Sequence, residues 1–124
     1  MSATLMAREH SATTRTDTSE VVRELNANLG TTAVAALAGS RDSKLPYKWV
    51  KGTRPSDAAI KRLNCAHMVW NFVAKNESDH IARSWFIGVN PLLDSESPLL
   101  ALRDGKMQDV VEAAEAFVTD VWQA

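Results

Sequence analysis

From Asp17 onward, apolar residues recur at the three- and four-residue spacing of α-helices, and no stretch alternates apolar and polar residues as a strand would. This periodicity constrains the fold more than any other feature, because helices must bury their apolar faces against one another. We therefore predict an all-α fold of about seven helices. Hydrophobic residues make up 45% of the chain and charged residues 23%, which favours a packed core over global disorder.

Residues 17–54 are predicted to form three helices with tight connections. The first starts with a reciprocal capping pair, the second is a short alanine-rich helix, and the third starts at Asp42 or Ser43. The signals are Asp17 with Glu20 at the first start, and Gly30, Gly39 and Gly52 at the three ends. This outline, with a small-residue second helix and a glycine turn, is that of a helix-turn-helix.

Residues 55–75 are predicted to form one long helix, with Pro55 in its first turn, after a polar, flexible arm at residues 1–16. The helix is apolar on more than one side over residues 60–73. Such a helix lies between two subdomains or between two protomers. We expect the protein to be at least a dimer through this helix, and we expect the parts on either side of it to have separate cores.

Residues 76–124 are predicted to form a small helical C-terminal domain. The pairs Asn90-Pro91, Ser97-Pro98 and Asp104-Gly105 fix turns, because proline restricts the residue before it and glycine ends helices. These turns are expected to fold short helices into a compact knob around Trp85, Phe86, Leu92, Leu93 and Leu102. A last helix follows from Met107, with a clear apolar stripe.

Charge is distributed unevenly in the chain. Between Arg41 and Arg62, seven basic residues oppose two acids, which leaves +5. Such a segment favours DNA phosphates, and the residues assigned to DNA are Lys44, Tyr47 and Lys48 for the groove and Arg41, Lys51 and Arg54 for the backbone. The alternative is an ordinary lysine-rich surface. Pro46 either lies in the first turn of the third helix or begins a helix of about one and a half turns that relies more on phosphates.

The C-terminal segment is acidic instead. From Asp94 to Ala124, seven acids oppose two basic residues, which leaves −5. These acids are either the solvated face of the last helix or a surface for a basic partner. Trp122, close to the chain end, is either a core residue or an aromatic anchor in a partner.

The residues from Trp85 onward resemble the C-terminal domain of the MbcA/ParS/Xre antitoxin family, which follows a degenerate Xre-like helix-turn-helix. The family motif is matched, over a similarity covering residues 18–122, by Trp85, Phe86, Asn90, Pro91, Leu93, Pro98, Leu99, Leu102 and Gly105, with Trp49 and Gly52 near the end of the recognition helix. The chain departs from the pattern where residues 94–97 read DSES in place of a usual glycine, and at Pro46.

The resemblance implies an antitoxin of a type II toxin–antitoxin pair. Its partner would be a toxin with a RES domain that destroys NAD, neutralised sterically when the antitoxin's C-terminal end covers the active-site cleft. The residues assigned to toxin contact are Arg103, Asp104, Phe117, Val121, Trp122, Gln123 and Ala124. Operator DNA would be a second partner. The alternative is a stand-alone helix-turn-helix regulator whose C-terminal half only dimerises it.

Other classes of function find little support in the sequence. Cys65 and His67 stand two apart on a helix and point to different sides, so we expect no metal. There is no phosphate loop or nucleophile motif, so we expect neither an enzyme nor a cofactor. A single cysteine, the lack of an eighteen-residue apolar run and the polar start indicate a cytoplasmic protein without a membrane span or secretory signal.

Overall fold

The computed structural model describes the backbone of residues 17–123 and the side chains of residues 17–120. The arm expected at residues 1–16 therefore lies outside the described residues. Within them the chain forms seven α-helices and one short 3-10 helix, with no strand beyond a single bridge between Asn90 and Glu96. This confirms the predicted all-α fold. The elements are α2 (Thr18–Leu29), α3 (Thr31–Ala38), α4 (Leu45–Val50), α5 (Asp57–Asn76), α6 (Asp79–Ile87), η1 (Pro91–Leu93), α7 (Pro98–Arg103) and α8 (Met107–Gln123).

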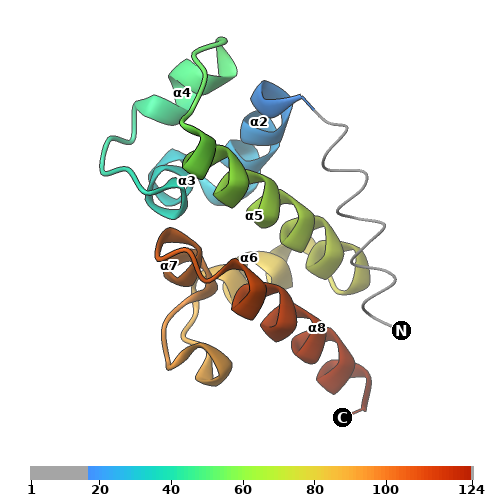
Figure 1. Cartoon of the computed structure of the whole chain (residues 1–124). Helices are drawn as coiled ribbons and strands as arrows, with labels where there is room; N and C mark the ends of the chain where they lie inside the picture. The colour runs from blue at the N-terminus through green and yellow to red at the C-terminus, as the bar shows by residue number, and fades with distance from the viewer. Residues whose placement is uncertain (1–16, 124) are drawn as a thin grey trace.

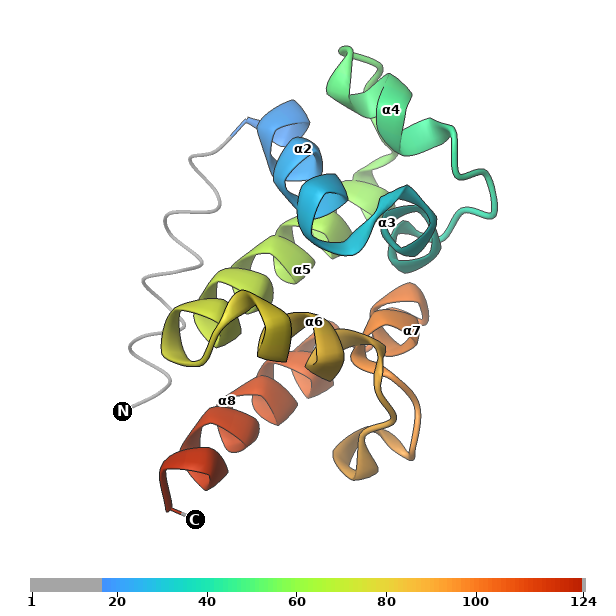
Figure 2. The ribbon, with the colours of Figure 1, turned by 180° about the vertical axis from the view of Figure 1, so that it is seen from behind.

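Helix α5 runs through the middle of the molecule (Figures 1 and 2). Helices α2, α3 and α4 lie around its N-terminal half, α6 and α8 pack along the rest, and α7 lies beside α3. Helix α4 and the C-terminal end of α8 are at opposite ends of the molecule in both views. The exposed basic residues of α4 are therefore far from the C-terminal end of α8.

The predicted helix starts need two corrections. Asp17 caps α2, but it does so by accepting from the Ser19 amide at 3.2 Å, while Glu20 pairs with Arg23 instead of reaching back to the cap. Helix α5 is capped by Ser56, whose hydroxyl accepts from the Ala59 amide at 3.1 Å. Pro55 precedes the helix and is not in its first turn. At the start of both helices, the cap is the side-chain oxygen that lies closest to the free amides of the first turn.

The described part of the chain has one continuous core, not the two that we expected. Buried side chains from α2 to α8 form a single cluster, and α7 packs directly against α3. The second apolar side of α5 is also buried within the chain: Leu63, Val69 and Phe72 are at most 1% exposed. The argument for a dimer through α5 is therefore wrong, because neighbouring helices of the same chain already cover it. The oligomeric state itself stays a prediction.

Two polar side chains on α5 contact neighbouring helices. His67 is buried, and its Nε2 lies 2.7 Å from the Glu24 carboxylate on α2. The Cys65 thiol faces the Met107 carbonyl on α8, and burial raises its pKa to about 12. The two side chains thus contact different elements. In the part of the chain that is described, no helix is long and apolar enough to cross a membrane.

Candidate functional site

Helix α4 is the element that carries the basic surface, and it is only six residues long. That length is about 1.7 turns, so the shorter of the two expected helices is the one observed. The helix begins at Leu45 with Lys44 at its N-cap, so the expected start at Asp42 or Ser43 is wrong. The Asp42 carboxylate instead accepts from the Lys44 amide at 2.9 Å, in the turn before the helix. Pro46 lies in the first turn, where its missing N–H removes no intrahelical hydrogen bond. Its ring is buried and its carbonyl accepts from Asn26 of α2 at 3.5 Å.

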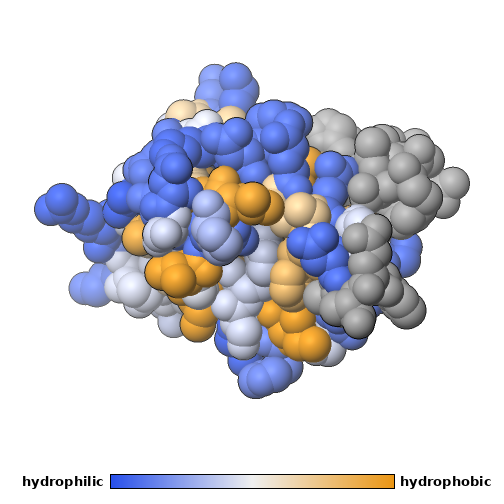
Figure 3. Space-filling view, turned by 90° about the horizontal axis from the view of Figure 1, so that it is seen from below, coloured by the Kyte–Doolittle hydropathy of each residue, from blue (hydrophilic) through white to orange (hydrophobic). Residues whose placement is uncertain are grey.

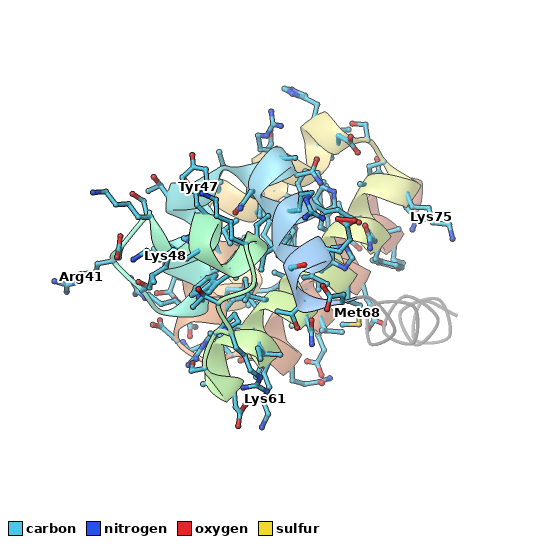
Figure 4. The ribbon with its side chains drawn as sticks, turned by 90° about the horizontal axis from the view of Figure 1, so that it is seen from above. Arg41, Tyr47, Lys48, Lys61, Met68 and Lys75 are labelled. Carbon is cyan, nitrogen blue, oxygen red and sulfur yellow. The ribbon has the colours of Figure 1, made fainter. Side chains whose placement is uncertain are left out.

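Buried Trp49 anchors α4 to the core and thereby fixes which side chains face outward. Tyr47 is 58% exposed, and Lys48 beside it is exposed as well. Figure 4 shows Arg41, Tyr47 and Lys48 on the same side of the molecule. Lys44, Lys51 and Arg54 are exposed in the flanking turns, so all six residues assigned to DNA reach the surface.

The segment from Arg41 to Arg62 does not act as a single basic surface. Lys61 points away from Arg41 and Lys48, at another edge of the molecule (Figure 4). The Arg62 guanidinium is used inside the fold, where its Nε donates to the Leu102 carbonyl at 3.0 Å. Arg54 forms an exposed ion pair with Asp57 at 2.9 Å. Counting charge along the sequence therefore overstated the positive charge available to a partner.

Most of the motif residues between Trp85 and Gly105 pack together in the fold. Phe86, Leu93 and Leu102 are buried, and the rings of Trp85 and Phe86 meet edge to face with centroids 5.3 Å apart. Asn90 starts η1 by accepting from the Leu92 amide at 2.9 Å. Pro98 is buried in the first turn of α7, and Gly105 with φ +83° follows its end. Pro91 is exposed in the first turn of η1.

The loop at residues 94–97 has an unfavourable backbone conformation at two positions. Asp94 and Ser95 both adopt left-handed conformations, with φ of 56° and 64°. They are the only non-glycine residues with positive φ in the described chain. The chain reverses there: the Ser95 amide donates to the Asn90 carbonyl at 3.0 Å, and the Asn90 amide donates to the Glu96 carbonyl at 3.1 Å. Side chains in this conformation cost energy that glycine would avoid.

Leu92 belongs to an exposed apolar surface that its sequence pattern did not predict. Leu92 was expected inside the knob, yet it is 63% exposed, while its neighbour Leu93 is buried. Ile87 and Val89 are also exposed, so apolar residues gather where α6 leads into η1. Figure 3 views the molecule from this lower end and shows hydrophobic clusters between hydrophilic residues. We call Ile87, Val89 and Leu92 the apolar surface.

The residues assigned to toxin contact do not form one site. Phe117 is half-buried, with its ring centroid 6.1 Å from that of Trp85, so it belongs to the packing of α8. Arg103 and Asp104 lie at the other end of α8, where a hydrogen bond from Arg103 holds the pKa of Asp104 below its ordinary value. The side chains of Val121, Trp122, Gln123 and Ala124 lie outside the described residues.

Arg103 lies instead beside a residue that was assigned to DNA. A surface pocket between the α3–α4 turn and the end of α7 is lined by both Arg41 and Arg103. The pairing follows from the packing of α7 on α3, and no local pattern in the sequence predicts it. Elsewhere among the described residues, no group of three His, Cys, Asp or Glu side chains is arranged to hold a metal ion.

Comparisons with protein-family models, with curated proteins and with solved structures found no significant match.

Proposed function

We propose that this protein is an antitoxin with two separate binding surfaces, one for operator DNA at α4 and one for a RES-domain toxin at the α6–α8 end. The observation that carries the proposal is the arrangement of charge and apolar surface. Exposed Tyr47 and Lys48 lie at one end of the molecule, and the acidic helix α8 lies towards the other. Such a separation lets one protein bind a polyanion and a second protein at the same time.

The DNA surface relies on few base contacts. A helix of six residues can place Lys44, Tyr47 and Lys48 near base edges, with Arg41, Lys51 and Arg54 on the backbone. Affinity would then come mainly from phosphates, and sequence preference would be modest. We infer that operator recognition needs either two copies of the chain or the toxin complex to reach useful specificity.

The toxin surface combines the apolar surface with the C-terminal tail. Exposed apolar residues grouped on one face are a usual sign of a protein contact. Helix α8 packs beside η1, so the apolar surface adjoins an acidic helix with exposed Asp109, Glu112 and Asp120. Acidic residues suit the rim of a cleft that holds the phosphates of NAD. Because Phe117 is packed on Trp85, we assign cleft contact to residues 121–124 rather than to 117–124.

The proposal predicts that a gene beside this one encodes a RES-domain protein, and it is tested by co-expression with that gene's product. Wild-type protein should copurify with it and prevent NAD loss and growth arrest. Leu92→Asp and deletion of residues 121–124 should each weaken protection, while Lys48→Glu/Lys51→Glu should leave protection intact and abolish retention of the upstream DNA fragment. Circular dichroism of each variant confirms folding first. Full protection by Leu92→Asp and by the deletion would refute the toxin assignment.

A stand-alone regulator is the second candidate, and the same apolar surface favours it. Ile87, Val89 and Leu92 would then pair two copies of the chain, and dimerisation would place two α4 helices on one DNA duplex. Light scattering distinguishes the two cases. A wild-type dimer that Leu92→Asp converts to a monomer with loss of DNA binding supports the regulator. A monomer that becomes a larger complex only with the toxin supports the antitoxin.

A further inference from the structure

The pocket shared by the two halves of the chain has the composition of an anion site. Its volume is about 540 Å³, which lies within the size range of small-molecule sites. The lining residues are Thr32, Ala36, Gly39, Ser40, Arg41, Ser43 and Arg103. They include two guanidinium groups and three hydroxyls, and none of them is acidic. Paired arginines with hydroxyl donors are the groups that recognise phosphate.

Two helices end at this pocket, and their exposed carbonyls would repel an anion if they were free. At the end of α3 they are occupied: the Ser40 amide donates to the Ala35 carbonyl at 2.8 Å, and the Gly39 amide donates to the Ala36 carbonyl at 3.0 Å. Backbone bonds therefore complete this helix end, and Arg41 is not needed to cap it.

The end of α7 is completed in the same way. The Lys106 amide donates to the Ala101 carbonyl at 2.9 Å, and Arg62 donates to the Leu102 carbonyl at 3.0 Å. Arg103 is therefore not needed as a cap. Its Nε lies 3.2 Å from the Asp104 carboxylate, an ion pair that orients the guanidinium without using its two terminal nitrogens. Those nitrogens form the pair of donors that arginine uses to grip phosphate.

A hydroxyl on the α3–α4 turn adds a donor. The Ser40 hydroxyl accepts from the Asp42 amide at 3.0 Å, which fixes the oxygen and leaves its hydrogen to donate. The same turn carries Arg41 and leads into α4. A ligand in the pocket would therefore contact both the turn that positions the basic helix and the helix α7 of the C-terminal motif.

We propose that this pocket binds a phosphate group between Arg41 and Arg103. The group has two possible sources, a free phosphate monoester of nucleotide size or a phosphodiester of DNA bound at α4. The DNA source rests on the proposed function, whereas the free source does not. In either case Arg103 acts together with Arg41 in this pocket and not in the toxin contact to which the sequence assigned it.

The experiment tests both possible sources of the phosphate group with the full-length chain. Inorganic phosphate and adenosine monophosphate are titrated at constant ionic strength, and the amide signals of Gly39 and Ser40 are followed by NMR. Binding of a labelled duplex from upstream of the gene is measured in parallel over a range of salt concentrations. The variants are Arg41→Gln, Arg103→Gln and Arg103→Lys, with Lys61→Gln as the matched control because Lys61 is basic, exposed and distant from the pocket.

For a free monoester, the signals should saturate in wild type and in Lys61→Gln, while Arg103→Gln weakens binding at least about tenfold and Arg103→Lys restores part of it. If the phosphate belongs to DNA, free anions should not saturate the pocket. Arg103→Gln should then reduce the dependence of duplex affinity on salt concentration by the equivalent of about one phosphate contact. The proposal is overturned if no anion saturates the site and Arg103→Gln does not weaken duplex binding. If the wild-type protein does not bind the duplex but binds the monoester saturably, operator binding is refuted and the phosphate site in the pocket is supported.

Discussion

Two turn-rich segments, residues 39–56 and residues 88–98, each hold a short helix against the same core, but they offer different chemistry to a partner. The first turns on Gly39 and exposes Tyr47 and Lys48, whereas the second turns on Asp94 and Ser95 and exposes Val89 and Leu92. The largest buried side chain is Trp49 in the first segment and Leu93 in the second, and each anchors its segment to the core. The comparison shows that anchoring to the core and recognition of a partner are carried by adjacent but different residues.

The largest predicted effect comes from removing the anchors. Trp49→Ala should lower the free energy of unfolding by about 3–5 kcal/mol and Leu93→Ala by about 2–5 kcal/mol, because each leaves a cavity in the shared core. Their exposed neighbours, in Tyr47→Ala and Leu92→Ala, should change it by less than about 0.5 kcal/mol. Urea unfolding followed by circular dichroism measures all four. Equal losses for Leu92→Ala and Leu93→Ala would contradict the division into anchor and exposed residue.

The second prediction separates the two surfaces by their response to salt. Three phosphate contacts, from Arg41, Lys51 and Arg54, should make DNA binding fall by about 40-fold between 50 and 200 mM salt. Toxin binding through the apolar surface should change much less, because apolar burial is not screened. Fluorescence anisotropy on duplex and on purified toxin gives both numbers. A steep salt dependence of toxin binding would instead assign that contact to the acids of α8.

The third prediction places a glycine in the turn that has none and removes the glycine from the other turn. Ser95→Gly should stabilise the protein by about 0.5–1 kcal/mol, since it relieves a left-handed conformation that glycine adopts freely. Gly39→Ala should destabilise it by about 1 kcal/mol, and only through its φ of 97°, because an added Cβ would meet no atom within 4 Å. Thermal unfolding monitored at 222 nm checks both. Destabilisation by Ser95→Gly would mean that the side chain, and not the backbone, sets this loop.

The smallest effect at neutral pH concerns Cys65 on α5, the helix shared by both segments. Its raised pKa means that burial opposes the thiolate, so the thiol should react very slowly with a disulfide reagent at pH 8 until the protein unfolds. Stability from this group is complete below pH 8.5 or so and should fall as the pH rises towards about 12. Cys65→Ala should flatten that alkaline loss. Rapid labelling of folded protein would show that α8 separates readily from α5.

The sequence by itself determined the helices and many, but not all, of the residues that start and end them. Periodicity, Asp17, Ser97-Pro98 and the glycines act within a few residues of their own positions, so their effects can be read locally. The gathering of Trp85, Phe86 and Leu93 around one knob was also predictable, because the turns between them are fixed by Asn90-Pro91 and by the helix starting at Pro98.

Only the tertiary structure decided which distant segments meet. The packing of α7 on α3 brings Arg103 beside Arg41, and the same packing takes Arg62 out of the basic surface by binding it to the Leu102 carbonyl. The packing of α2, α3, α6 and α8 against α5 covers both of its apolar sides within the described chain. The fold also buries Leu93 and leaves its neighbour Leu92 exposed. Side chains with the same local pattern take opposite roles here, because burial depends on the neighbours that the whole fold supplies and not on the residues adjacent in sequence.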